Sequence, residues 1–422
     1  MDLFSLFKKD YFNYLISIIL PAIISGISIP IFKHLLGAEG YGYFSIWLNA
    51  VLIGTAVLSA WITQSIIRYY PMSANKLSFS KKAIRLSLLT QLLFLLPSFI
   101  IAWSVSKDPL LALLCALLLF AISIQFTLLP IIQSGFLSKK IIWSELIRIG
   151  SYVLMAVVLL KLSGIKYIYA LLISVLISYV FSLLYLIRQM HTHIDNVTIG
   201  DEEQVAVFKD FIKFGAPFSL WFIFSYLLSY VDKLYTLKNC GGEAQGNYQA
   251  IFDLLYKSIT LIISPAITSL YPILTAAYTR GDRAEIKKFL LKIIGYEIVG
   301  FVLVTLGYWF VGANILLPIL KIPQTQTYKW IGFIVISGAF VWQFAILVQK
   351  KYELKMKSGF LLLMVFIALA VQLVFYSVFN TFNHQLLYPL GFLLSAVVYL
   401  LLISASSMFE FLGLNNKKRI EQ

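Results

Sequence analysis

Three cations and several carboxylates lie inside stretches that are otherwise apolar enough to cross a membrane. Lys257 interrupts one such stretch, with Asp253 four residues before it, and Asp232 and Lys233 interrupt the stretch before that. An ionisable group inside a bilayer is costly unless it faces a partner or a wet cavity, so such residues suggest function by default. Their chemistry would be electrostatic, because ammonium groups hold anions and carboxylates hold cations or protons.

The Asp253–Lys257 pair combines the deepest charge with an obvious neighbour. Lys257 lies ten residues into its stretch, roughly 15 Å deep at the helical rise per residue. Asp253 shares its helix face in the favourable order of acid before base. A self-neutralised pair that stabilises the bundle and a role in a cavity are both open readings. We expect Asp232 and Lys233 nearer the outer end of their stretch, where a lysine can snorkel to the interface.

Two arginines are further candidates for binding an anionic substrate. Arg148 follows Glu145 by three residues and lies roughly 10 Å inside its stretch. It could pair with Glu145 or with Glu297, or it could meet an anionic head group. Arg68 ends another stretch at the cytoplasmic surface, where a positive-inside anchor is the favoured reading and substrate contact is the alternative. Asp232, Asp253, Glu145 and Glu297 are therefore candidates for ion coupling or for structural charge pairs.

No pattern for catalysis, metal binding or cofactor binding is visible. The sequence lacks a G-x-x-x-x-G-K-[ST] phosphate loop, and none of its four histidines forms H-E-x-x-H. Two cysteines, Cys115 and Cys240, are too few for a disulfide framework or a cysteine metal cluster. We therefore expect no catalytic residues, no metal and no cofactor.

The composition predicts an all-α polytopic membrane protein. Hydrophobic residues make up 60% of the 422 residues and charged residues 13%, with a mean hydropathy of +0.86, whereas soluble domains are about a quarter charged. Apolar stretches of about 20 residues predict twelve transmembrane helices. They are roughly 11–32, 41–67, 83–105, 110–136, 141–160, 167–187, 214–237, 247–278, 289–312, 328–349, 359–379 and 387–409.

The basic residues indicate the orientation of the chain. The net charge is +15, but the basic residues fall in short loops. This location follows the positive-inside rule of membrane proteins and does not indicate nucleic-acid binding. Alternate loops hold 24 of the 34 Lys and Arg residues, and this bias places both termini in the cytoplasm.

The two halves of the chain repeat each other. The pattern G-x-E-x-x-G-x-aromatic begins at Gly37 and again at Gly241, in the outer loop that opens the second stretch of each half. Tyr-Pro recurs at Tyr70 and Tyr271, and Lys-Lys recurs at 139–140 and 350–351. We predict an N-terminal six-helix lobe over 1–190, a cytoplasmic linker over 191–213 and a C-terminal six-helix lobe over 214–422. Since each half has an even number of spans, the repeats run parallel, and such transporters bind substrate between the halves.

The sequence resembles bacterial polysaccharide flippases of the O-antigen and capsule type in three places. These are the stretch from Leu36 to Phe44, the span ending in Arg68, and Asp232 followed by Gly242 to Tyr248. These belong to the superfamily that also contains multidrug and toxin extrusion transporters. The resemblance implies two six-helix lobes forming a V around a central cavity. It implies a flippase of the bacterial inner membrane that moves undecaprenyl-pyrophosphate-linked oligosaccharide units to the outer leaflet, with membrane lipids, a polysaccharide polymerase and chain-length machinery as partners. Lys257, Arg148 and Arg68 would then bind substrate.

Two other classes of protein compete with this interpretation. A multidrug or cation antiporter would share the fold and depend on intramembrane carboxylates, although the deep Lys257 speaks against a purely cation-binding cavity. A membrane-embedded polysaccharide polymerase or ligase would be an enzyme with a large outer loop. The longest outer segment, about 313–327, is short and poor in acids and bases, so this reading ranks third.

Overall fold

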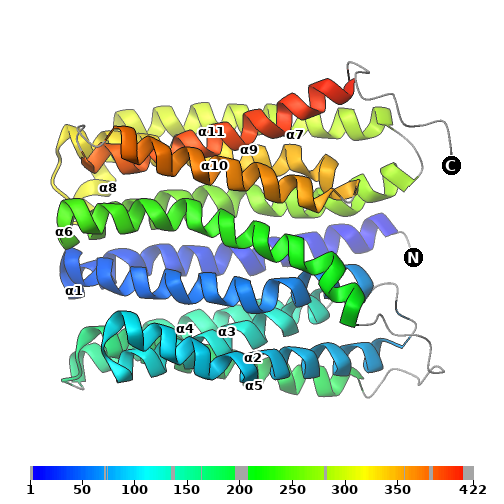
Figure 1. Ribbon diagram of the computed structural model, residues 1–422, viewed down its shortest axis with the longest axis horizontal. Coiled ribbons are helices and arrows are strands. Elements are labelled where there is room, and N and C mark those ends of the chain that lie inside the picture. The colour runs from blue at the N-terminus through cyan, green and yellow to red at the C-terminus, as the bar shows by residue number, and fades with distance from the viewer. Residues whose placement is uncertain are drawn as a thin grey trace. The chain divides into compact units, whose positions relative to one another are not determined.

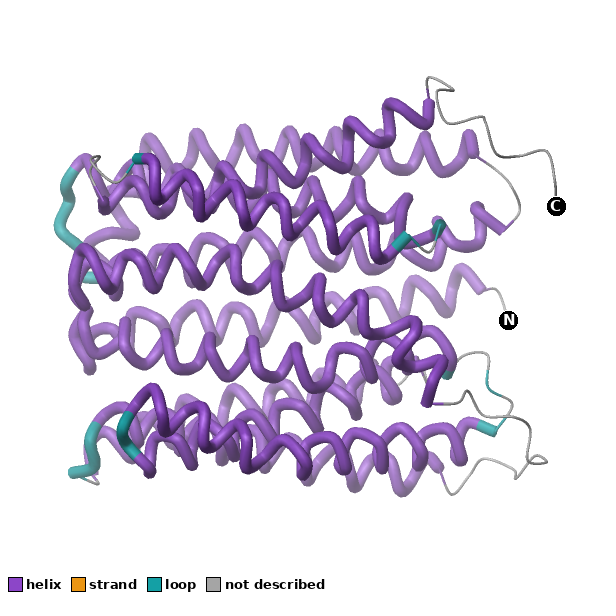
Figure 2. The backbone as a smooth tube through the Cα atoms, viewed as in Figure 1, coloured by secondary structure: helices purple, strands orange, loops and turns teal. Residues whose placement is uncertain are grey.

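The computed structural model describes residues 3–70, 73, 75–134, 138–162, 164–194, 208–279, 283–355, 357–379 and 384–411. Over these residues the chain is helical apart from short turns, and the described part contains no strand (Figures 1 and 2). The helices are α1 (Leu3–Tyr69), α2 (Lys76–Ser106), α3 (Pro109–Ser134), α4 (Ser138–Leu162), α5 (Tyr167–Ile194), α6 (Phe208–Thr279), α7 (Arg283–Gly307), the π-helix η1 (Tyr308–Gly312), α8 (Ala313–Ile319), α9 (Gln326–Leu354), α10 (Ser358–Val378) and α11 (His384–Phe411).

Two of these helices are too long to be single membrane spans. α1 has 67 residues and α6 has 72, which at 1.5 Å per residue is about 100 Å, against a hydrocarbon core of about 30 Å. Gly37 interrupts α1 and Gly241 interrupts α6 with non-helical backbone, so each holds two spans. Ten helices of the described chain are long and apolar enough to cross a membrane. With α1 and α6 counted twice, the prediction of twelve spans is confirmed.

The two interrupting glycines carry the predicted repeat into the backbone. Gly37 has φ 71° and ψ 172°, and Gly241, 204 positions later, has φ 85° and ψ 170°. Nothing lies within 4 Å of a Cβ built at either position, so space does not explain the glycine. Positive φ does, because only glycine adopts it without cost. Of the Tyr-Pro repeat, Pro71 and the side chains of Tyr271 and Pro272 lie outside the described residues.

The chain divides into two compact units, Met1–Tyr226 and Leu227–Gln422. In the first unit, α1 packs on α3, α4 and α5, and α2 packs on α3. The first turns of α6 belong here, because Oγ of Ser65 donates a hydrogen bond of 3.1 Å to the backbone oxygen of Phe211. In the second unit, α9 packs on α7 and α11, and α10 packs on α11. Most of the predicted linker, 195–207, lies outside the described residues.

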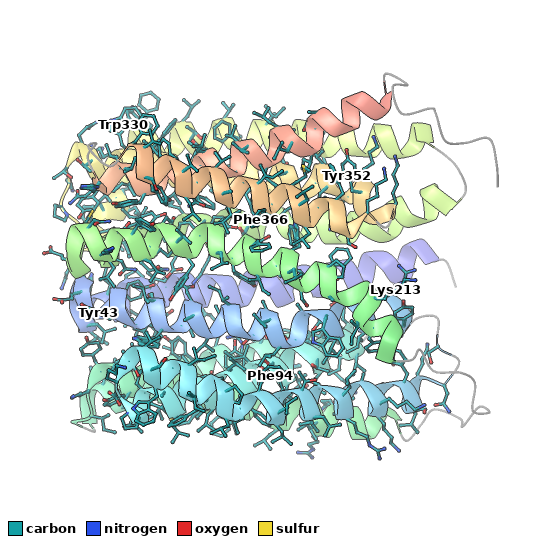
Figure 3. The ribbon with its side chains drawn as sticks, in the orientation of Figure 1. Tyr43, Phe94, Lys213, Trp330, Tyr352 and Phe366 are labelled. Carbon is teal, nitrogen blue, oxygen red and sulfur yellow. The ribbon has the colours of Figure 1, made fainter. Side chains whose placement is uncertain are left out.

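Polar side chains turn inward and apolar ones outward on several helices, which suits a bilayer as the solvent. On α2 the buried face holds Ser80, Ser87 and Gln91, and Oγ of Ser87 lies 2.8 Å from Oγ1 of Thr127 on α3. From Leu89 onward the exposed face of the same helix is mainly apolar, as Phe94 illustrates (Figure 3). Helices in lipid associate through small and polar residues rather than through hydrophobicity, so this inversion is expected.

We predict that Gly241→Ala destabilises the protein by about 1–2 kcal/mol, because alanine would be forced into the left-handed region. The measurement is the midpoint of thermal unfolding of the purified protein in detergent. Gly295→Ala is the matched control, since Gly295 has ordinary helical φ in α7 and nothing lies within 4 Å of its added Cβ. There alanine should leave stability unchanged or raise it. Equal shifts in both variants would contradict the role of Gly241.

Candidate functional site

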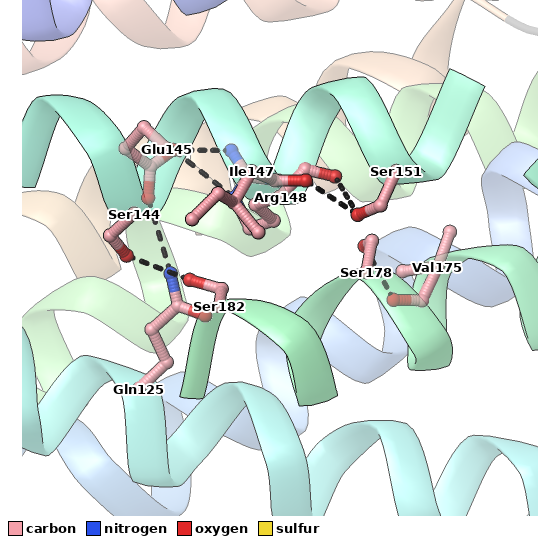
Figure 4. Close-up of polar contacts among 9 residues, drawn as sticks. All are labelled: Gln125, Ser144, Glu145, Ile147, Arg148, Ser151, Val175, Ser178 and Ser182. Carbon is pink, nitrogen blue, oxygen red and sulfur yellow. Dashed lines mark hydrogen bonds and ion pairs between the residues drawn. The ribbon is translucent and has the colours of Figure 1, made fainter. Parts of the chain in front are cut away.

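Arg148 lies in the first unit, in a polar cluster between α3, α4 and α5 (Figure 4). Its Nη2 lies 2.6 Å from Oε2 of Glu145, and its Nε donates to the same oxygen at 3.1 Å. Nε2 of Gln125 on α3 donates to the other carboxylate oxygen at 3.1 Å. On the other side, the guanidinium carbon of Arg148 lies 5.2 Å from the ring centre of Tyr179 on α5. Of the two partners considered from the sequence, Glu145 is the one that Arg148 binds here.

Serines near this ion pair form hydrogen bonds between helices and within them. Oγ of Ser144 on α4 lies 2.7 Å from Oγ of Ser182 on α5, and Ser151 and Ser178 bond to backbone oxygens of their own helices. The Arg148 side chain remains 23% exposed. Arg148 is thus paired with a carboxylate, while part of its side chain stays exposed.

Arg68 closes α1 within the same unit. It is half-buried, and its guanidinium carbon lies 5.4 Å from the ring centre of Tyr69. That ring stacks on Phe211 of α6 at 5.9 Å. The position at the end of a span fits the anchor expected from the sequence, and its role in substrate contact stays a prediction.

Asp232 is a fully buried carboxylate of the second unit. The backbone N–H of Lys233 donates to its Oδ1 at 2.7 Å, and the hydroxyl of Tyr248 donates to its Oδ2. Tyr248 lies on the other side of the Gly241 turn, so the bond joins the two arms of the α6 hairpin. Carboxylates that accept such bonds can remain inside a protein at much lower cost.

Lys233 does not snorkel to an interface. Its side chain is 3% exposed, and Nζ lies 3.9 Å from the ring centre of Phe252 on the opposite arm of the hairpin. No hydrogen bond or ion pair of Nζ occurs among the described residues. Asp232 and Asp253 attract this charge and Lys257 repels it. Lys233 is therefore a buried ammonium held by an aromatic face and by carboxylates that have other partners.

Asp253 and Lys257 form the ion pair that their spacing predicted. Nζ of Lys257 lies 2.8 Å from Oδ1 of Asp253, which is buried, while the Lys257 side chain is 53% exposed. Lys257 is 16 residues beyond Gly241, about 24 Å along a straight helix, so its charge lies within the depth of a membrane. This is a deep cation with an open side.

Glu297 on α7 is a buried carboxylate of another kind. Its side chain is 7% exposed, and among the described residues neither oxygen has a hydrogen-bond partner. α7 packs on α9, where Gly300 of α7 faces the Phe340 ring, and Gln343 lies one turn beyond Phe340 on α9. Nε2 of Gln343 donates to Thr260 on α6 at 3.0 Å.

Several residues of these clusters escaped the sequence reading. Tyr248 is the aromatic position of the second G-x-E-x-x-G-x-aromatic motif, so the sequence marks this residue but does not reveal that it bonds to Asp232. Tyr179 and Phe252 carried no signal, because their contacts cross between helices. Among the described residues no group of three or more His, Cys, Asp or Glu could hold a metal ion. The arrangement as found is suited to holding and exchanging charges.

Comparison with known proteins places the fold among transporters. A MOP superfamily transporter from Pyrococcus furiosus Vc1, described as having a binding pocket of reverse polarity that suggests a different function, is 13% identical with a TM-score of 0.71, covering 97% of this chain and 96% of that one. A MATE protein in a bent conformation is 12% identical with a TM-score of 0.71, covering 99% and 97%. An outward-facing multidrug resistance MATE family transporter of the MOP superfamily is 12% identical with a TM-score of 0.71, covering 98% and 96%. No curated protein matches the sequence significantly.

The class that the fold defines is a multi-pass membrane protein with the architecture of MOP superfamily transporters. A family model described as "Polysaccharide biosynthesis protein" matches residues 7–278, more than half of the chain. The chain belongs to the polysaccharide biosynthesis protein family. The resemblance stated from the sequence is thus confirmed.

We predict that Glu145→Gln lowers stability by about 3 kcal/mol, because it leaves the Arg148 guanidinium inside the helix cluster without a carboxylate. The double variant Glu145→Gln/Arg148→Gln should regain most of that loss, since no charge is then unpaired. Thermal unfolding in detergent measures both. The control is Glu39→Gln, an exposed glutamate of the same unit that should change little. A double variant as unstable as the single one would refute the pairing.

We predict that Tyr248→Phe lowers stability by about 1–3 kcal/mol, because Asp232 then keeps only its bond from the backbone of Lys233. Asp232→Asn in the same background should recover part of the loss, since a neutral amide costs less to bury than an ionised carboxylate. The comparison uses thermal unfolding in detergent, with Tyr43→Phe, an exposed tyrosine, as control. If Tyr248→Phe shifted the midpoint no more than Tyr43→Phe, the bond across the hairpin would not matter.

Proposed function

We propose that this protein is a flippase that moves undecaprenyl-pyrophosphate-linked oligosaccharide units from the inner to the outer leaflet for O-antigen or capsule synthesis. Membership of the polysaccharide biosynthesis family and the MOP transporter fold support a transport step on this route. The observation that carries the proposal is Lys257, a half-exposed ammonium deep in a span. An anionic head group would find its counter-charge there.

The physical problem of such a flippase is a head group that hydrocarbon rejects. A pyrophosphate and several sugars cannot cross a bilayer unaided, because burying charged and polar groups without partners is costly. Lys257 and Arg148 would offset the negative charge, and the polyprenyl tail would stay in the bilayer. Arg68, at the end of α1, would meet the head group on the cytoplasmic side. Alternating access moves the substrate without making or breaking a covalent bond, so no catalytic residue is required.

The cellular setting follows from the same proposal. The protein would lie in the cytoplasmic membrane of a bacterium, with both termini inside, as the distribution of basic residues indicates. Its partners would be the lipid-linked substrate, the surrounding lipids, and a polymerase with its chain-length machinery that consumes the flipped unit.

A multidrug or cation antiporter of the same fold is the second candidate. Glu297 favours it, because a buried carboxylate without a hydrogen-bond partner in the described residues is suited to taking up a proton or a cation. Proton-coupled efflux of cationic drugs from vesicles separates the two functions. The antiporter would lose that efflux in Glu297→Gln, whereas a flippase would show no such efflux.

We predict that Lys257→Met cuts surface polysaccharide at least about tenfold in a flippase-deficient strain that the wild-type gene complements. A charge-assisted bond to the head group is worth about 1.5–3 kcal/mol, which corresponds to about 10- to 100-fold. Polysaccharide is measured on whole cells at equal protein levels. Lys238→Met, an exposed lysine of the same helix, should complement fully. Wild-type polysaccharide in both Lys257→Ala and Arg148→Ala, at normal expression, would refute the proposed role of these cations.

A further inference from the structure

Asp253 is attracted to two lysines and forms an ion pair with one of them. Its Oδ1 holds Nζ of Lys257 at 2.8 Å, and it is also attracted electrostatically to Lys233, the second cation near it. Lys257 is half-exposed, whereas Lys233 and Asp253 are buried. The exposed cation is thus the one that is neutralised, and the buried cation is the one with no ion pair in the described residues.

The desolvation cost of a buried ammonium would lead one to expect the ion pair on Lys233 rather than on Lys257. A buried ammonium normally has an ion pair or several hydrogen bonds, because desolvation otherwise outweighs the attraction. The Phe252 ring offers Lys233 a cation–π contact, which is strongest when desolvated. The other nearby carboxylate, Asp232, is already engaged by Tyr248 and by a backbone N–H. Asp232 and Asp253 both attract the Lys233 ammonium, and neither forms an ion pair with it in the described residues.

We propose that Lys233 is a standby counter-ion for Asp253, and that it frees Lys257 to bind a phosphate or pyrophosphate group. When an anion approaches the open side of Lys257, the Asp253 carboxylate moves from Lys257 to Lys233. Asp253 then has a cationic partner both before and after binding, with the anion replacing Asp253 on Lys257. Lys233 acts here as a positioning residue that does not touch the ligand. The inference rests on the proposed function and names the anionic part of its substrate.

The exchange explains why both lysines lie on one hairpin. Without Lys233, releasing Lys257 would strand Asp253 as a buried carboxylate without a cation, which is strongly unfavourable. With Lys233, the release costs little beyond a change of partner. Phe252 holds Lys233 in place meanwhile, and Tyr256 stacks on Phe252 with ring centres 4.6 Å apart.

The test measures binding of farnesyl pyrophosphate to the purified full-length protein in detergent. We expect Lys233→Met to weaken binding roughly tenfold, which lies within the range of coupling between residues of one charge network. Asp253→Asn should bind as tightly as wild type or a few-fold more tightly, because Lys257 no longer has an internal partner. The double variant Lys233→Met/Asp253→Asn should bind like Asp253→Asn, since without the carboxylate no standby partner is needed. This rescue separates the exchange from direct contact between Lys233 and the ligand. If Lys233 contacted the ligand directly, the double variant would bind as weakly as Lys233→Met.

Controls separate folding and ligand identity from the exchange. Lys233→Met also removes a cation that attracts the buried Asp232, so its thermal midpoint is measured beside its binding. Lys238→Met on the exposed face should bind normally. Phosphatidylglycerol competing as well as farnesyl pyrophosphate, with the same dependence on Lys233, would overturn the assignment to a carried substrate. Equal binding by Lys233→Met and Lys238→Met would overturn the exchange itself.

Complementation of a flippase-deficient strain is measured beside binding. A wild-type gene that fails to complement sinks the proposed function, while the binding series still decides the exchange. If the wild-type gene complements and Lys233→Met binds and complements normally, the proposed exchange is contradicted and the proposed function is supported.

Discussion

The cost of placing charge inside a bilayer constrains this protein more than any other interaction. Three cations within the spans have a carboxylate or an aromatic face against them: Glu145 and Tyr179 for Arg148, Asp253 for Lys257, and Phe252 for Lys233. Such internal partners make the charges tolerable, but they also compete with any anion that the charges could bind. A transporter of anionic head groups must therefore have partners that can be displaced at low cost.

The two units meet this constraint differently. In the first unit, Arg148 has two bonds to Glu145, which is fixed in turn by Gln125, so releasing the arginine would leave a carboxylate with only an amide. In the second unit, Asp253 lies near a second lysine that has no ion pair in the described residues. The charges of the second unit are therefore suited to exchange, whereas Arg148 would keep Glu145 and meet an anion through the exposed part of its side chain.

Local spacing explains what the sequence could predict. The ion pairs of Glu145 with Arg148 and of Asp253 with Lys257 join residues three and four apart on one helix, so helical geometry alone brings them together. The spans follow from apolar length, and the turns at Gly37 and Gly241 follow from a motif repeated 204 residues apart. The bond from Tyr248 to Asp232 and the contact of Lys233 with Phe252 depend on how two arms of a hairpin align, which spacing along one helix does not reveal.

The depth of Lys233 shows how one unknown turn changes a functional reading. Counted from the start of its apolar stretch, Lys233 falls near the outer end, where snorkelling is cheap. The chain turns at Gly241, eight residues beyond Lys233 or about 12 Å along the helix, and the returning arm covers the ammonium. A lysine that could reach water needs no explanation, whereas a buried lysine against the Phe252 ring does. Its burial makes it a member of the charge network rather than an anchor, and that network determines whether Lys257 can change partners.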